Sequence, residues 1–105
     1  MDKPVVRVSI LRCKAEHFVE LRQMMTASLD RLKPGILKMR GLIHYYAGAD
    51  EATASLTNVS VWNSLEDAKR LDTFQPMLDL GKEFAAKGAS FERPIMNYAT
   101  LWELA

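Results

Sequence analysis

Three side chains that can form hydrogen bonds alternate along residues 58–62. Asn58, Ser60 and Trp62 share one face if this stretch is a β-strand, because successive residues of a strand point to opposite faces. A group of this kind can bind the polar atoms of a small molecule. The alternative is structural: Trp62 packs in the core at the strand end, and Asn58 bonds a neighbouring backbone group.

His44 is the candidate for proton transfer, because an unperturbed imidazole titrates near neutral pH. It lies on the strand expected to pair with the one that carries Asn58. If residues 44 and 58 pair directly, or are offset by two, His44 shares the face of Asn58. A slip of one residue places Tyr45 there instead and sends His44 to the other face, as an interface or surface residue.

The elements that would hold these residues follow from hydrophobic patterning. Alternating β-branched residues over 5–12 predict a first strand. Residues 14–33 have helical spacing and predict an amphipathic helix that ends at Pro34 and Gly35. The apolar stripe of that helix comprises Phe18, Leu21, Met25, Leu29 and Leu32.

Three further strands are expected. Residues 41–47 are aromatic and apolar, and the polar loop 48–55 leads into the strand that ends at Trp62. These two strands should form an antiparallel hairpin. A last strand is predicted over residues 94–104, where apolar and polar residues alternate.

A second helical region follows Trp62. Asn63 or Ser64 serves as N-cap, and an acidic residue three positions on completes a capping box. Pro76 cannot lie inside a continuous helix, because it lacks an N–H and clashes with the preceding turn. The helix should therefore break near residues 72–75 and resume as a second piece that ends near Gly88.

The resulting order, β-α-β-β-α-β, predicts an α+β fold of the ferredoxin-like class. Right-handed crossovers place both helices on one face of a four-stranded antiparallel sheet. The length, 105 residues, is typical of one domain, so residues 1–105 are expected to form a single unit.

The other face of the sheet should be apolar and uncovered. Val6, Val8 and Ile10 alternate with Val5 and Leu11, so the first strand is apolar on both sides. Each such side chain left in water forfeits roughly 1.5–3 kcal/mol. A second copy of the sheet is the simplest cover, which predicts a homodimer through this face.

Composition excludes several classes of partner. Lys and Arg number 14 and Asp and Glu number 13, so no basic surplus exists to bind nucleic acid or an anionic membrane. No apolar run approaches the ~20 residues that span a bilayer, and the N-terminus lacks the pattern of a signal peptide. A cytoplasmic protein is expected. Cys13, the single cysteine, has no Cys or His partner at metal spacing, so we expect a reduced structural thiol and no metal site.

A family resemblance rests on Gly41, on Asn58 and Trp62 four residues apart, and on the run from Trp62 to Ala68. These features resemble the antibiotic biosynthesis monooxygenase family, a branch of the dimeric α/β barrel proteins. The resemblance implies a pocket in each protomer between the sheet and its helices. In some members it implies a cofactor-free oxidation of polycyclic aromatic substrates, with donors at the positions of Asn58 and Trp62 that bond the substrate oxygens.

No cofactor is needed for such a reaction, because an electron-rich phenolate or enolate can itself give electrons to dioxygen. The protein need only stabilise the anion with hydrogen-bond donors in a dry pocket. The chain departs from the family pattern in residues 65–87, which lack a tyrosine and contain only Arg70 in place of a tyrosine and arginine pair. The haem-degrading branch needs an asparagine on the first strand and a histidine on the second helix, and neither is present.

The expected catalytic residues are Asn58, Trp62 and His44, and those expected to bind substrate are Tyr45, Ser60, Phe18, Met25 and Tyr98. Arg7 and Arg93 could bind an anionic group, although exposed ion pairs are the expectation. Three functions remain open: a cofactor-independent monooxygenase acting on an aromatic or polyketide-like molecule, a non-oxidative binding or isomerase-type protein, and a dimerisation module without chemistry. A pocket filled by Trp62, Phe18 and Met25 would indicate the third. Substrate and pathway do not follow from the sequence.

Overall fold

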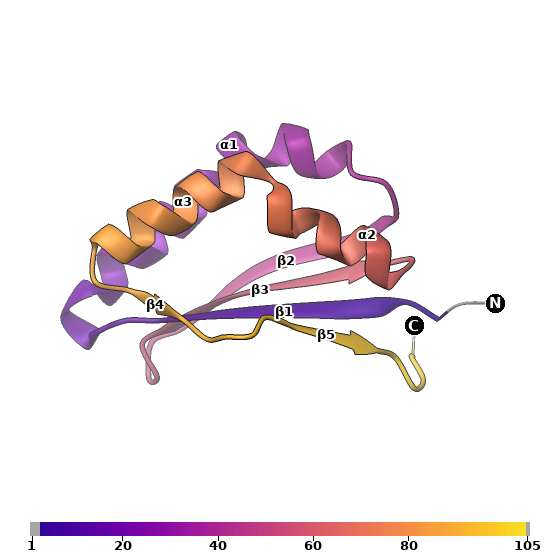
Figure 1. Cartoon of the computed structure of the whole chain (residues 1–105). Coiled ribbons are helices and arrows are strands. Elements are labelled where there is room, and N and C mark those ends of the chain that lie inside the picture. Colours follow the sequence, from indigo (N-terminus) through magenta and orange to yellow (C-terminus); the bar gives the residue numbers. More distant parts are fainter. Residues whose placement is uncertain (1–2, 105) are drawn as a thin grey trace.

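One antiparallel sheet carries three helices on a single face, as Figure 1 shows for the computed structural model, which describes residues 3–104. The strands pair in the order β2-β3-β1, and the free edge of β1 pairs with both β4 and β5. The strands are β1 (Val5–Arg12), β2 (Leu42–Asp50), β3 (Ser55–Trp62), β4 (Ser90–Phe91) and β5 (Met96–Ala99). The expected ferredoxin-like α+β fold is confirmed, and the sheet does not close into a barrel.

The first helix is longer than its sequence pattern predicted. Helix α1 (Phe18–Leu37) follows a short 3-10 turn and continues through Pro34, so the expected end at Pro34 and Gly35 is wrong. Ile36 is buried and extends the apolar stripe by one turn. The ring of Phe74 packs closely on this last part of the helix, because a Cβ at Gly35 would lie only 2.5 Å from it.

One member of the predicted apolar stripe of α1 points outward. Leu29 is 61% exposed, whereas Ser28 is buried and its hydroxyl donates to the carbonyl of Met25 at 2.6 Å. Satisfying the hydroxyl within the helix lets a serine occupy this inward position.

The second helical region breaks where Pro76 predicted. Helix α2 (Leu65–Lys69) runs into a 3-10 turn, Arg70–Thr73, and α3 (Gln75–Ala86) then begins with Pro76 in its first turn. Of the two possible N-caps of α2, Ser64 is the one used: its hydroxyl accepts the backbone N–H of Asp67 at 3.1 Å.

The last strand is two short pieces and not one strand over residues 94–104, as the pattern had predicted. Pro94, which follows Arg93 through a cis peptide bond, lies between β4 and β5. Proline has no backbone N–H to donate to a neighbouring strand, so the pairing with β1 is interrupted around Pro94. The chain leaves the sheet after Ala99, and Trp102 beyond it is exposed.

The two faces of the sheet differ as the sequence predicted. The face toward the helices contributes Val5, Leu11 and Trp62 to the core, together with residues of all three helices. The outer face carries Val6, Val8 and other apolar side chains with no helix over them, including Tyr46, Met96 and Tyr98, which are 57%, 43% and 52% exposed.

Within residues 3–104, no helix combines the length and the apolar character needed to cross a bilayer.

Candidate functional site

Polar side chains interrupt the apolar inner face of the sheet in two neighbouring rows. Arg7 on β1 pairs with Ser60 on β3, and Ser60 pairs in turn with Tyr45 on β2. The next row joins Ser9 to Asn58. Successive inward positions of a strand are about 6.7 Å apart, so the two rows form a small polar floor. Apolar rows bound it at both ends, with Leu11 paired to Leu56 and Val5 paired to Trp62.

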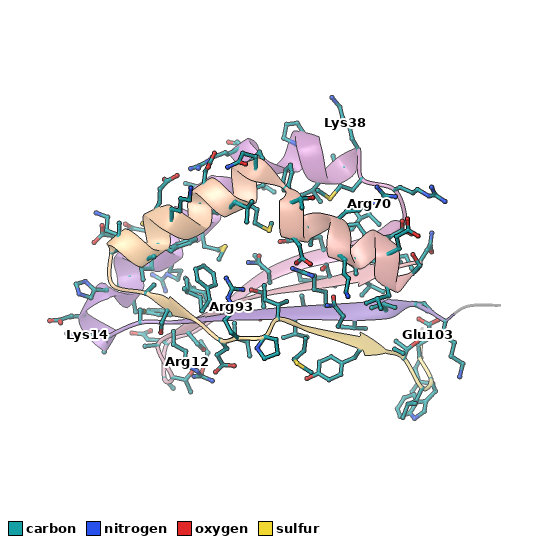
Figure 2. All side chains as sticks on the ribbon, in the orientation of Figure 1. Arg12, Lys14, Lys38, Arg70, Arg93 and Glu103 are labelled. Atoms are coloured by element: carbon teal, nitrogen blue, oxygen red, sulfur yellow. The ribbon has the colours of Figure 1, made fainter. Side chains whose placement is uncertain are left out.

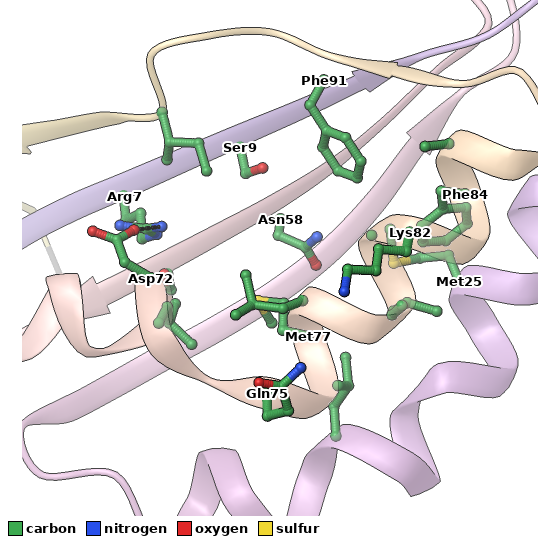
Figure 3. Close-up of a pocket in the computed structure, with 18 of the residues that line it drawn as sticks. Arg7, Ser9, Met25, Asn58, Asp72, Gln75, Met77, Lys82, Phe84 and Phe91 are labelled. Atoms are coloured by element: carbon green, nitrogen blue, oxygen red, sulfur yellow. Dashed lines mark hydrogen bonds and ion pairs between the residues drawn. The ribbon is translucent and has the colours of Figure 1, made fainter.

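A cavity of about 610 Å³ lies above this floor, between the sheet and α3. Its size falls in the range of ligand pockets, roughly 300–1,000 Å³. Figure 3 shows Arg7, Ser9 and Asn58 on the strands and Gln75, Met77 and Lys82 on the helical side. Among the apolar residues of the wall are Met25, Met77, Leu80, Phe84 and Phe91.

Arg7 is the charged residue of the floor. It is only 5% exposed, and its Nη2 lies 2.6 Å from Oδ1 of Asp72 in the turn before α3. A second nitrogen, Nη1, donates to Oδ1 of Asn97 at a longer 3.4 Å. The exposed ion pair expected for Arg7 is therefore wrong, since the guanidinium is enclosed and only the Asp72 side chain is half exposed.

Tyr45 reaches the floor because β2 contains a bulge. Leu42 pairs with Trp62, the register then shifts between Leu42 and His44, and Tyr45 pairs with Ser60. The extra residue, Ile43, turns the strand by one position, so the next inward side chain is Tyr45. The phenol oxygen is buried and makes no hydrogen bond to any described residue. Burial raises the pKa of Tyr45 to about 12, against the opposing effect of the Arg7 charge, so the phenol is protonated and can donate.

The same bulge places His44 with Val61, on the outer face, where its ring stacks with Tyr46 at a centroid distance of 5.8 Å. His44 does not line the larger cavity; it borders a second, smaller one of about 380 Å³ between α1 and the strands, and the two cavities share Met25, Leu32, Tyr45 and Asn58. Of the two alternatives that the sequence left open, the structure thus brings Tyr45 to the floor.

Trp62 lies at one end of the polar floor. Its side chain is fully buried, and the indole N–H donates to the hydroxyl oxygen of Ser60 at 2.8 Å. The donor expected to bond a substrate oxygen directly is thus used within the protein. Ser60 accepts this bond and keeps its own O–H, at a position that lines the cavity.

The remaining expected binding residues fall in different places. Met25 lines both cavities, whereas Phe18 is 2% exposed and belongs to the core. Tyr98 pairs with Val6 on the outer face, away from the cavity, so its expected place in the pocket is wrong. Trp62 and Phe18 are buried in the core and a cavity of about 610 Å³ stays open beside Met25, so these three side chains do not fill the pocket as expected of a dimerisation module.

Solved structures share this architecture. A proposed antibiotic biosynthesis monooxygenase from Deinococcus radiodurans superposes with a TM-score of 0.73 at 14% identity, over 96% of each chain. One from Nitrosomonas europaea gives 0.68 at 9% identity, over 100% of this chain and 97% of the other. A third, from Caulobacter crescentus, gives 0.68 at 10% identity, over 96% and 92%.

The chain has the antibiotic biosynthesis monooxygenase fold. At these identities the likeness concerns the fold, and function must be argued from the site. No protein-family model matches the sequence, and no curated protein matches it significantly. Among residues 3–104, no group of three or more His, Cys, Asp or Glu side chains is arranged to hold a metal ion.

Sequence patterning missed part of the site that it could have found. On β1 the inward residues are Val5, Arg7, Ser9 and Leu11, so a buried strand face carries two polar residues between two apolar ones. The same polar pair between apolar ends occurs on β3. Asp72 and Lys82 carry no comparable signal, because only the packing of the turn and of α3 over the sheet brings them to the cavity.

Proposed function

We propose that this protein is a cofactor-independent monooxygenase that acts on an aromatic or polyketide-like small molecule. The observation that carries the proposal is the polar floor: Asn58, Ser60 and Tyr45, whose side chains carry hydrogen-bond donors, line a cavity with a mainly apolar wall. A site of this kind fits a flat, mostly apolar ring system with one or two oxygens.

The donors would stabilise the anion that reacts with dioxygen. A phenol or enol becomes electron-rich when it loses its proton, and preorganised donors in a dry site favour the charged form. The Asn58 amide, the Ser60 hydroxyl and the neutral Tyr45 phenol are donors of this type. Tyr45 cannot act as the base near neutral pH, because burial holds its proton in place.

The reaction balances without an external reductant. An anionic carbon passes an electron to dioxygen, and the radical pair combines to form a C–O bond and a peroxide. Loss of water from the protonated peroxide leaves a carbonyl group. One oxygen atom enters the product and the other leaves as water, so the CH₂ group of an anthrone would become the C=O of a quinone with all electrons supplied by the substrate.

Trp62 has an indirect role in this proposal. Its bond to Ser60 Oγ holds the serine side chain in place, and the remaining O–H of Ser60 would donate to a bound substrate. Trp62 thus positions a donor, and His44, whose ring lies toward the outer face, is not part of the proposed donor set.

The working unit proposed is a homodimer. The outer face of the sheet combines Val6, Val8 and Val61 with the more exposed Tyr46 and Met96, which is a large apolar area for a single protein surface. Pairing of two such faces would cover it and leave both cavities on the outer sides of the dimer.

Oxygen uptake tests the proposed reaction. Native protein should accelerate uptake with members of a panel of dihydroxynaphthalenes and anthrones, and Asn58→Ala should slow it by about 10²–10³-fold. Asn63→Ala is the matched control, because Asn63 is exposed and lies just beyond β3, outside the cavity. Uptake that is unchanged in Asn58→Ala would contradict the donor role.

A second candidate is a non-oxidative binding or isomerase-type protein on the same scaffold. The observation that favours it is the engagement of the Trp62 N–H by Ser60, which leaves the floor one donor short of the expected pair. Saturable binding of the same aromatic compounds with no acceleration of oxygen uptake would support this candidate over the monooxygenase.

A further inference from the structure

The cavity is more positive than the protein as a whole. Three cationic side chains line it, those of Arg7, Lys82 and Arg93, against one acidic side chain, that of Asp72. The whole chain carries a formal net charge of only +1. Positive charge is therefore concentrated where a ligand would bind, and low-dielectric walls strengthen its effect there.

Arg7 is placed to bind an anion from below. It projects from the middle of β1, between Ser60 on β3 and Asn97 on β5, and is nearly enclosed. The contacts to Asp72 and Asn97 engage only part of the N–H donors of the guanidinium. A guanidinium can bond a planar carboxylate through two parallel N–H groups.

Lys82 and Arg93 add charge around the rest of the cavity. Lys82 on α3 extends toward the space above Asn58, as Figure 3 shows, and no carboxylate of residues 3–104 lies within ion-pair distance of it. Arg93 lies in the segment between β4 and β5, and its guanidinium stands 5.5 Å from the centroid of the Phe91 ring.

We propose that the ligand of this cavity is an aromatic carboxylate, held with its carboxylate on Arg7 and its ring system along Met77, Phe84 and Phe91. This inference rests on the proposed function for its assignment of the cavity as the substrate site. It names the substrate class: a ring compound that bears an acidic group in addition to the oxygen that Asn58 and Tyr45 would bond. The alternative is that the Arg7–Asp72 pair only joins β1 to the turn before α3. That role would not explain why Lys82 and Arg93 also line the cavity.

Binding in the absence of oxygen tests the proposal on the native protein. The probes are 2-naphthoate and its neutral counterpart 2-naphthamide, compared by calorimetric titration. Charged hydrogen bonds are worth more than neutral ones, so naphthoate should bind roughly tenfold or more tightly. The preference should weaken as salt is added, although less than for exposed charges, because Arg7 is enclosed. Equal affinity for the two probes overturns the proposal.

Two variants test whether the preference for naphthoate over naphthamide depends on Arg7. Arg7→Met should remove this preference, provided that circular dichroism shows a folded protein. Asp72→Asn keeps Arg7 and removes its competing carboxylate, so naphthoate should bind more tightly while naphthamide is unaffected. Arg12→Met is the matched control, because Arg12 lies on the same strand, is half exposed beside Glu92 and does not line the cavity. A preference that survives Arg7→Met, or that does not grow in Asp72→Asn, contradicts the role of Arg7.

The outcome is separable from that of the oxygen-uptake experiment. Uptake with neutral naphthols and no preference for naphthoate would leave the monooxygenase in place and overturn the carboxylate site. Tight, Arg7-dependent binding of naphthoate with no oxygen uptake from any compound would support the carboxylate site and contradict the monooxygenase.

Discussion

At the scale of single residues, Tyr45 stands out as a buried phenol without a hydrogen-bond partner among the described residues. A buried polar atom of this kind lowers stability in the free protein. Active sites commonly hold groups whose partner arrives with the substrate. Measurements of stability and of ligand binding therefore distinguish this role of Tyr45 from a purely structural one.

We expect Tyr45→Phe to raise the free energy of unfolding by about 1 kcal/mol, because it removes an unsatisfied polar atom and leaves the ring in place. The same change should weaken binding of aromatic ligands. Urea denaturation measures the first effect and calorimetry the second. Tyr46→Phe is the control, since Tyr46 is 57% exposed on the outer face. A loss of stability in Tyr45→Phe would mean that the hydroxyl is already satisfied.

The raised pKa of Tyr45 predicts a pH dependence of stability. The pKa of this tyrosine is 10.0 in the unfolded chain and about 12 in the folded protein, mainly because of burial. Between these values the folded state binds the extra proton, so its stability falls as pH rises. This residue should account for roughly 2–3 kcal/mol of the loss. Because Tyr45→Phe lacks this loss, the stabilities of native protein and variant in denaturation curves should diverge as pH rises from 9 to about 11.5, by no less than half that amount.

At the scale of elements, the junction between β2 and α2 depends on Gly41. This residue has φ of +81°, and its carbonyl accepts the N–H of Asn63 at 2.8 Å, which ties the start of β2 to the end of β3. A Cβ at Gly41 would lie 2.1 Å from Oδ2 of Asp67, a buried carboxylate in the first turn of α2. The close packing holds α2 against the edge of the sheet beside Trp62.

Gly41→Ala should therefore destabilise the protein by more than the roughly 1–3 kcal/mol typical of a left-handed non-glycine residue. Gly88→Ala is a matched control, because Gly88 has φ of +87° but nothing within 4 Å of its added Cβ. The difference between the two variants in thermal or urea denaturation isolates the contact with Asp67. Equal losses would show that only backbone strain matters.

At the scale of the whole molecule, the uncovered sheet face is the surface through which we propose that two copies pair. Val8 lies near its centre, paired with Val59 on one side and Met96 on the other. An aspartate at this position would leave a charge unpaired inside any interface between two sheets, which is costly. No helix of the described residues packs on this face of the sheet.

We expect light scattering of native protein to give a mass near twice the 11.9 kDa of the chain. Val8→Asp should reduce the mass to that of one chain. Val19→Asp is the control and should not change it, because Val19 is 50% exposed on α1, away from the sheet. A native protein that is monomeric at micromolar concentration would contradict the proposed dimer.

Local patterns in the sequence determined the elements and the faces of this protein. Alternation placed Asn58, Ser60 and Trp62 on one side of β3, and Pro76 marked the break before α3, because both effects depend on neighbouring residues only. The close contact of Gly35 with the ring of Phe74 could not be predicted in this way, since it joins segments far apart in the chain.

The composition of the site was decided by the tertiary structure. The extra residue Ile43 in β2 places Tyr45, and not His44, on the inner face of the sheet. The indole N–H of Trp62 donates to Ser60 and is therefore not free for a ligand. The Arg7–Asp72 pair joins residues 65 positions apart. Strand register and long-range ion pairs depend on how distant elements pack against one another, and the spacing of residue types along the chain does not predict this packing.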